Sequence, residues 1–299
     1  MVLNMNTVKF LILFLTINLS YAQTIKGVVK DSITGKSIAF ANVVLKNGKG
    51  TYTNEFGNFE LKIKNINNDT LKISTIGYQS RILPTTSFTT DGTLEILLQL
   101  EIENLDEVII SNKIIKYGER DVLGEKRDGN MGVTSLIGYE TTVLIENPKN
   151  RTGKVNGVYI QLKKRKDAEY VATFNLKFYE FDSITNSPGK LLYHENLYVQ
   201  PKNKKYKLWV DVKDLGILFP ESGICLGVEM VNTSGKVKKY AYFGPRYRYT
   251  FTEEKGLKTW SNYHNTGWRD GSIEYKNPKR TKVGVLNPMI GVEVEYILK

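Results

Sequence analysis

Cysteine and histidine are almost missing from this chain of 299 residues, which contains one cysteine and two histidines. Cys225 has no second cysteine to pair with, so each folded domain must be stabilised by an apolar core. We expect Cys225 to be a small apolar residue of the strand-like stretch GICLGVEMV. His194 and His264 are too few for a three-histidine zinc site, and no His-Glu-x-x-His helix is present. The sequence therefore predicts no metal and no cofactor.

Other catalytic signatures are missing as well. The sequence has no Gly-x-Ser-x-Gly elbow, no P-loop and no dinucleotide-binding fingerprint. A carboxylate pair of the glycosidase kind would escape such a search, because its two members can meet from distant strands. We therefore expect a protein that is not an enzyme. The alternative is a hydrolase of envelope or extracellular polysaccharide with a carboxylate pair in its C-terminal half.

A long apolar run occurs only at the start of the chain. Residues 1–22 contain one positive charge at Lys9, an apolar run at 10–19 and the end Ser-Tyr-Ala. This layout is typical of a secretory signal peptide cleaved before Gln23. The run has about half of the ~20 apolar residues that a membrane-spanning helix requires. We expect an exported protein with no transmembrane segment after cleavage.

Negative charge is in deficit, and the formal net charge is +11. Such an excess can indicate nucleic acid or an acidic surface as a partner. The lysines, however, are scattered, and the densest runs, at 163–166 and 202–207, are typical of hairpin ends. Exported proteins meet little nucleic acid, so we expect none as a partner. We interpret the charge as a solvated surface, with polyanionic glycans and lipid head groups as alternatives.

Glycine (25), tyrosine (18) and phenylalanine (12) are plentiful, while long stretches with helical period are absent, which indicates an all-β protein. Residues 23–111 hold short β-rich runs separated by polar turns, a pattern typical of a β-sandwich. The tetrad Asn54-Glu55-Phe56-Gly57 precedes an alternating strand at 58–63. Asn54 can cap a turn and Gly57 can adopt a left-handed conformation, so we interpret the tetrad as a corner and not as a binding site.

The order of residues in this part is familiar. It runs Gly27-Val28-Val29, Asp31, Thr34-Gly35, Ile38, Ala41-Asn42-Val43, Gly50-Thr51, Thr53-Asn54, Gly57, Phe59, Leu61, Leu71, Ile73-Ser74 and Gly77-Tyr78. It resembles the carboxypeptidase regulatory-like domain, a transthyretin-like β-sandwich frequent in exported and outer-membrane proteins of Gram-negative bacteria. The resemblance implies a protein of the cell envelope, located in the periplasm, at the outer membrane or outside the cell.

The stretch 105–110, LDEVII, is similar to the segment that closes this domain in TonB-dependent outer-membrane transporters, just before their plug. A transporter barrel of 22 strands needs more than ~200 residues, and the residues after Ser111 are too few for it. The sequence therefore predicts a protein that shares the N-terminal module of the transporters and continues differently.

The remaining chain is predicted to form a second β domain. Residues 112–130 are polar, and we expect a linker that can include a short helix. Residues 131–299 show at least eight alternating runs with turns between them, which favours a larger antiparallel sandwich of the jelly-roll kind. This half also loosely resembles jelly-roll modules of exported bacterial proteins, some of which bind sugars.

The stretch 260–270, WSNYHNTGWRD, is the candidate binding site. Its aromatic rings could stack on sugar rings while its amides and its arginine bind hydroxyl groups. In the alternative interpretation the tryptophans close the end of the sandwich and the polar groups satisfy loop backbone. The function predicted from the sequence is an exported, non-catalytic accessory or binding protein of the bacterial envelope, whose partner is an envelope protein or a glycan. The candidate ligand-binding residues are Trp260, Tyr263, His264, Trp268 and Arg269.

Overall fold

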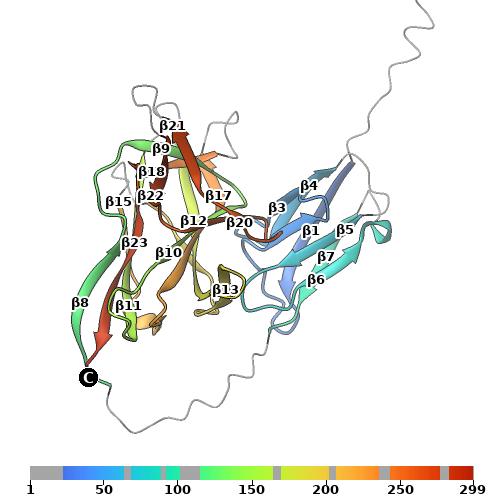
Figure 1. The fold of residues 1–299 in the computed structure, drawn as a ribbon. Coiled ribbons are helices and arrows are strands. Elements are labelled where there is room, and N and C mark those ends of the chain that lie inside the picture. The colour runs from blue at the N-terminus through green and yellow to red at the C-terminus, as the bar shows by residue number, and fades with distance from the viewer. Residues whose placement is uncertain are drawn as a thin grey trace, which may run out of the picture.

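The chain folds into two β domains that lie side by side (Figure 1). The computed structural model describes residues 23–63, 69–88, 92–101, 115–163, 170–201, 207–235, 243–276 and 283–298. The predicted signal peptide at 1–22 and the stretch 105–110 lie outside the described residues. Within the described chain, no helix has the length and apolar character needed to cross a membrane.

The first domain is a sandwich of two small sheets. One sheet has the order β4-β1-β7, and the other has the order β3-β2-β5-β6, followed by a short 3₁₀ turn, η1. The strands are β1 (Gln23–Asp31), β2 (Asn42–Leu45), β3 (Gly50–Tyr52), β4 (Asn58–Ile63), β5 (Thr70–Ser74), β6 (Arg81–Pro84) and β7 (Thr93–Leu98), and η1 is Thr85–Ser87.

Alternation along β4 builds the core of this domain. Phe59, Leu61 and Ile63 are buried and the residues between them are exposed, as the sequence predicts. The corner before β4 is also as predicted: the Asn54 side-chain oxygen accepts hydrogen bonds from the backbone N–H groups of Phe56 (2.9 Å) and Asn58 (3.0 Å). Gly57 has a φ of +75°, which other residues rarely adopt.

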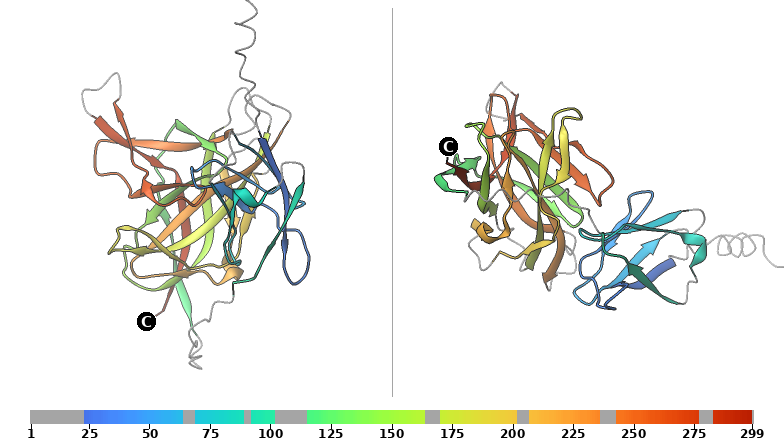
Figure 2. Two further views of the ribbon diagram at one scale, coloured as in Figure 1. Left: turned by 90° about the vertical axis from the view of Figure 1, so that its right-hand side faces the viewer. Right: turned by 90° about the horizontal axis from the view of Figure 1, so that it is seen from below.

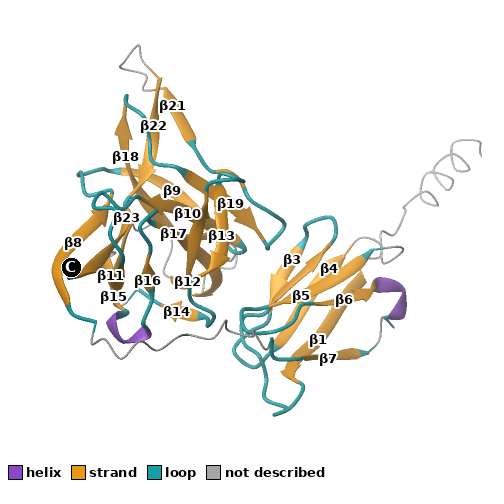
Figure 3. Cartoon of the chain, turned by 60° about the horizontal axis from the view of Figure 1, so that its bottom comes forward, coloured by secondary structure: helices purple, strands orange, loops and turns teal. Residues whose placement is uncertain are grey.

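The second domain is a larger sandwich of two antiparallel sheets (Figure 3). The first sheet contains β10 (Tyr139–Ile145), β12 (Tyr170–Asp182), β13 (Ser187–Leu191), β14 (Leu197–Val199), β17 (Ile224–Gly235), β19 (Thr259–Tyr263) and β20 (Arg269–Asp270). The second contains β8 (Tyr117–Gly124), β9 (Met131–Leu136), β11 (Gly153–Lys163), β15 (Lys207–Asp211), β16 (Leu218–Phe219), β18 (Phe243–Thr252), β21 (Ile273–Lys276), β22 (Val283–Pro288) and β23 (Ile290–Ile297). A 3₁₀ turn, η2 (Lys213–Leu215), follows β15. The all-β sandwich fold predicted from the sequence is confirmed.

The inner faces of these two sheets form the main core. Phe174 and Phe178 of the first sheet are fully buried with Val292, Val294 and Tyr296 of the second. The burial of these side chains removes a large apolar area from water, at about 25 cal/mol per Å². This core joins the two sheets of the second domain.

The segment expected to be a linker, 112–130, includes a strand. Residues 117–124 form β8 and pair with β23 at the edge of the second sheet. Arg120 of β8 lies opposite Glu295 of β23, and their side chains form an ion pair of 3.1 Å. A run of charged residues therefore forms a strand here, because its partner strand offers opposite charge on the solvent face.

Candidate functional site

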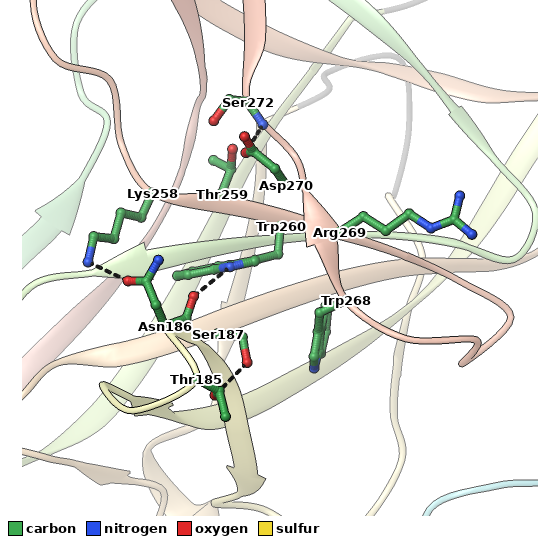
Figure 4. A pocket seen from close by; sticks show the side chains of 10 residues that line it. All are labelled: Thr185, Asn186, Ser187, Lys258, Thr259, Trp260, Trp268, Arg269, Asp270 and Ser272. Atoms are coloured by element: carbon green, nitrogen blue, oxygen red, sulfur yellow. Dashed lines mark hydrogen bonds between the residues drawn. The ribbon is translucent and has the colours of Figure 1, made fainter.

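The predicted site residues separate into two places. Trp260, Trp268 and Arg269 line a hollow of about 460 Å³ on the second domain, shown in Figure 4. Tyr263 and His264 line a different hollow, of about 670 Å³, between the two domains. The stretch divides because β19 ends at Tyr263, and the chain then turns through His264 and Asn265, both at positive φ, before β20 begins. The five residues therefore do not form one site.

Trp260 has a packing role in the first hollow. Its indole N–H donates a hydrogen bond to the backbone oxygen of Asn186 (3.1 Å), and its ring lies 6.0 Å from that of Phe181. Only 7% of the residue is exposed, within a small cluster that includes Leu144 and Cys225. Trp260 is thus a packing residue, as in the alternative interpretation of the sequence, in which the tryptophans close the end of the sandwich.

Trp268 is more accessible than Trp260. It is half-buried, and its ring packs edge-on against Tyr179 with 5.4 Å between ring centres. The hydroxyl groups of Thr185 and Ser187 lie across the hollow from it, while Arg269 is directed away from the Trp260 ring (Figure 4). An aromatic ring facing hydroxyl groups in an open hollow can contact the apolar face of a sugar and exchange hydrogen bonds with its hydroxyls.

The β12–β13 turn closes one side of this hollow. Asp182 accepts a hydrogen bond from the backbone N–H of Ile184 (2.8 Å), and Asn186 has a φ of +50°. The Asn186 side chain accepts a hydrogen bond from the Lys258 ammonium (2.9 Å). The turn is therefore tied both to itself and to the neighbouring strand, which holds the polar wall of the hollow in place.

His264 joins the two domains. Its Nδ1 lies 2.6 Å from the side-chain oxygen of Asn42 in β2, and the Asn42 side-chain N–H donates to the His264 backbone oxygen (2.9 Å). The imidazole also stacks on Tyr52 of β3, at 5.1 Å between ring centres. The residue is 1% exposed, and burial lowers the pKa of His264 to about 4 against the opposing effect of Glu229. His264 is thus a neutral contact residue in this interface.

A buried charge cluster lies on the outer face of the first sheet, beside His264. The Lys177 ammonium is 2.9 Å from Glu140 and 2.8 Å from Glu229. Tyr179 donates a hydrogen bond to Glu140 (2.9 Å), and Tyr52 of the first domain donates one to Glu229. Every polar group named here has a charged partner, as buried charges require.

The protonation of this cluster follows from its burial and its charges. Burial alone would lower the pKa of Lys177, but the attraction of Glu140 and Glu229 outweighs burial and raises that pKa well above its usual value. Burial raises the pKa of Tyr52 well above its usual value, and the Glu229 carboxylate adds to the effect. Lys177 is therefore charged and Tyr52 is a neutral donor at physiological pH.

Pattern reasoning missed this cluster. Glu140, Lys177 and Glu229 each occur in an alternating strand, at positions that would normally face solvent. The register places Glu140 beside Glu229 on neighbouring strands and Lys177 beside Gly227. A Cβ at Gly227 would lie 2.1 Å from a Glu140 carboxylate oxygen, so the glycine leaves the space that the carboxylate occupies. The one signal in the sequence was Gly227, a glycine on the same strand face as Glu229.

Glu140 and Glu229 are two neighbouring carboxylates, as the hydrolase alternative requires. Glu140 and Glu229 are both bound to Lys177, and Tyr52 covers Glu229 from the first domain. Both carboxylates are buried, so no substrate bond has access to them in this arrangement. Among the described residues, no group of three or more histidine, cysteine, aspartate or glutamate side chains could hold a metal ion.

Cys225, the single cysteine, lies in the same small cluster as Trp260. It is fully buried, and burial raises the pKa of its thiol to about 12. A thiol of this kind remains protonated at physiological pH and is a poor nucleophile. Cys225 is a packing residue of the strand, as expected.

Comparisons with known proteins concern the first domain. Residues 25–110 match the model of the CarboxypepD_reg-like domain family. Over 110 residues the chain is 39% identical to the TonB-dependent receptor SusC of Bacteroides thetaiotaomicron, an alignment that covers 36% of this chain and 10% of the receptor. The chain thus spans a small part of that relative's length. The resemblance seen in the sequence is confirmed: the first domain is a CarboxypepD_reg-like domain similar to a segment of a TonB-dependent receptor.

Proposed function

We propose that this protein is an exported, non-catalytic binding protein of the Gram-negative cell envelope, and that its second domain binds a glycan in the hollow beside Trp268. The observation that carries the proposal is the hollow itself, where a half-buried tryptophan faces the hydroxyl groups of Thr185 and Ser187. Arg269 and Asp270 stand at its rim and add charged hydrogen-bonding groups.

The first domain supports the envelope location. It is a CarboxypepD_reg-like domain, and the relative with which it shares 39% identity is named as a TonB-dependent receptor. An apolar run at 10–19, with the layout of a signal peptide, agrees with export. In this proposal the first domain holds the second at the envelope, and the second domain contacts the ligand.

The burial of the carboxylate pair supports a role without catalysis. A glycosidase needs one carboxyl group as acid and another as base or nucleophile, both in contact with the glycosidic bond. Glu140 and Glu229 instead form a closed cluster with Lys177. Glu229 also accepts a hydrogen bond from Tyr52 of the first domain, so this carboxylate is part of the contact between the domains.

Binding of glycans to the mature chain tests the proposal. The chain from Gln23 onward is applied to a glycan array, and the affinity for each bound glycan is measured by calorimetry. Trp268→Ala should weaken binding about tenfold, equivalent to about 1.4 kcal/mol. Tyr263→Ala removes an exposed aromatic ring from the other hollow and should leave the affinity unchanged. Absence of any bound glycan, or equal affinity of a folded Trp268→Ala variant, contradicts the proposal.

An envelope protein is the second candidate partner. Strand β6 is the edge of its sheet, and most of its side chains, including Ile82, are exposed. An exposed edge strand can pair with a strand of another protein. Ile82→Lys should then reduce binding to a purified envelope receptor, as measured by surface plasmon resonance, and leave glycan affinity intact. Unchanged receptor binding by this variant rules out β6 as the contact.

A further inference from the structure

The third tryptophan, Trp209, stands on a different surface from the other two. It lies on β15, on the outer face of the second sheet of the second domain, and 48% of it is exposed. The register places it beside Tyr159 of β11, two residues from Gly157. A Cβ at Gly157 would be 2.5 Å from Cζ2 of the indole. The ring therefore lies directly above a glycine, which leaves the opposite side of the ring open to solvent.

Carboxylates flank this ring because of the strand register. Gly157 pairs with Glu293 of β23 on one side and with Asp211 of β15 on the other. The Trp209 ring thus lies over the backbone of Gly157, with the side chains of Glu293 and Asp211 on its two sides. Together with Asp214 of the following turn, these residues line a hollow of about 360 Å³.

A β-bulge with a buried amide borders the same hollow. Asn156 is the extra residue of a β-bulge in β11, between Val155 and Gly157. It lines the hollow, it is 8% exposed, and its side-chain N–H donates to Glu295 (3.2 Å). Its side-chain oxygen has no hydrogen-bond partner in the described structure, which is unusual for a buried polar atom. Bulges often redirect a side chain at a functional position.

The charges of the hollow decide the class of ligand. Each of its cationic groups has an anionic neighbour: Arg120 and Lys154 both pair with Glu295, and Lys213 pairs with Asp211. Glu293 and Asp214 have no ion pair among the described residues, so the groups that remain are acceptors. A ligand for this surface needs an apolar face for the indole and several hydrogen-bond donors at its edge. Anionic ligands are disfavoured by the two carboxylates.

A neutral sugar ring meets both requirements. The C–H groups on one face of a pyranose pack on an aromatic ring, and its hydroxyls donate hydrogen bonds to carboxylate and amide oxygens. We propose that the outer face of the second sheet carries a second glycan-binding site, in which Trp209 stacks on a neutral sugar residue and Glu293 and Asp214 accept hydrogen bonds from its hydroxyls. The site shares the ligand class of the proposed function and none of the residues at the Trp268 hollow.

Binding of neutral hexasaccharides of glucose, mannose, galactose and xylose tests this site. Calorimetry and quenching of tryptophan fluorescence are measured on the mature chain carrying Trp268→Ala, so that the other hollow does not contribute. At least one hexasaccharide should bind, and a further Trp209→Ala change should weaken that binding at least tenfold. Leu218→Ala, which truncates another exposed apolar side chain of the same sheet, should leave the affinity unchanged.

A second variant tests whether binding depends on the position of the Trp209 ring as well as on its presence. Gly157→Ala keeps Trp209 but places a methyl group where the indole lies, so it should weaken binding by a similar factor while the thermal unfolding temperature stays within a few degrees. Oligosaccharides of uronic acids should bind at least tenfold more weakly than the neutral ones. The proposal is overturned if no hexasaccharide binds in a Trp209-dependent way, or if oligolysine binds there in preference to sugars.

The two glycan sites are distinguishable by their variants. Loss of binding with Trp209→Ala in the Trp268→Ala background concerns only the sheet-face site. Loss of binding with Trp268→Ala in the Trp209→Ala background concerns only the hollow of the proposed function. Each of the two proposed sites can therefore be contradicted without affecting the other.

Discussion

At the residue scale, Lys177 is the most consequential side chain of the second domain. Its ammonium lies between two buried carboxylates, those of Glu140 and Glu229, and only 5% of the residue is exposed. The attraction within such a cluster roughly offsets the cost of removing its charges from water. The whole cluster therefore contributes little to the free energy of unfolding, whereas removal of one of its charges should lower that free energy strongly.

Lys177→Met should lower the free energy of unfolding by about 3–5 kcal/mol, because it leaves two carboxylates buried without their cation. Urea unfolding followed by circular dichroism measures the change. Lys149→Met is the matched control, since Lys149 forms a partly exposed ion pair with Glu119 and its loss should cost less than about 1 kcal/mol. Equal costs for the two variants would show that the cluster does not depend on Lys177.

His264 should make the stability of the protein depend on pH. Its pKa in the folded protein is about 4, below the usual value of 6.5, because the residue is buried. As pH falls below 6.5, the unfolded chain binds a proton at this residue and the folded chain does not, so stability is lost down to about pH 4. The loss from this residue should reach about 2 kcal/mol at pH 5.

His264→Asn should reduce this loss between pH 6.5 and pH 5, as measured by urea unfolding at each pH. Asparagine tolerates the positive φ of +50° found here and keeps a side-chain N–H toward Asn42. Carboxylates whose pKa values are lowered, such as Glu119 and Asp31, lose their contribution only at more acidic pH. A variant whose stability falls with pH as steeply as the wild type would remove His264 as the cause.

At the element scale, the corner before β4 is the point where the turn sets the strand register. Gly57→Ala should lower the free energy of unfolding by about 2 kcal/mol, because it puts a side chain at positive φ and 2.7 Å from the Val29 carbonyl oxygen. Gly35→Ala is the control: it has a φ of +68° but no atom within 4 Å of its Cβ, so it should cost about 1 kcal/mol. Thermal unfolding of both variants measures the difference, and a reversed order contradicts the steric explanation.

Alternation and turn chemistry made the elements of the first domain predictable. The corner at Asn54–Gly57 and the buried positions of β4 follow from local rules, which depend on a few neighbouring residues. Strand β8 was not predictable in this way. Its charged residues are stable in a strand because Glu295, about 175 positions later in the chain, lies opposite Arg120. Pairing at such separation leaves no local signal.

The candidate site was predictable only in part, for a related reason. The aromatic stretch 260–270 does border a hollow, but Tyr263 and His264 contribute to the domain joint instead. Alternation tells which face of a strand points away from the core, and it does not tell whether another domain covers that face. Glu140 and Glu229 lie on the face that alternation directs away from the core, and Tyr52 of the first domain covers Glu229 there.

At the scale of the whole molecule, the two domains lie next to each other (Figure 2). Polar contacts join them. Tyr52 and Asn42 of the first domain reach Glu229 and His264 of the second. Further contacts add to them, such as the edge-on packing of Phe40 on Tyr198 at 4.9 Å. These contacts lead us to expect that the two domains move as one unit.

The double variant Tyr52→Phe, Asn42→Ala should loosen this unit, because it removes the hydrogen bonds to Glu229 and His264. Small-angle X-ray scattering should then give a larger radius of gyration than for the wild type. Calorimetry should show two unfolding transitions for the variant and one for the wild type. Tyr78→Phe removes a comparable hydrogen bond inside the first domain, to Asp31, and should leave the radius unchanged. An unchanged radius for the double variant would argue against these contacts as the joint.

The parallel pairing of β1 and β7 has a consequence for how the first domain can be used. Because the first and last strands of the domain run in the same direction, the chain enters at one end of the sandwich and leaves at the other. The domain is therefore an in-line spacer, about 30 Å long by the length of β1. A spacer of this kind can be inserted ahead of very different proteins without forcing the chain to double back. Strand β7 therefore brings the chain to the end of the sandwich opposite to Gln23, whichever domain comes next.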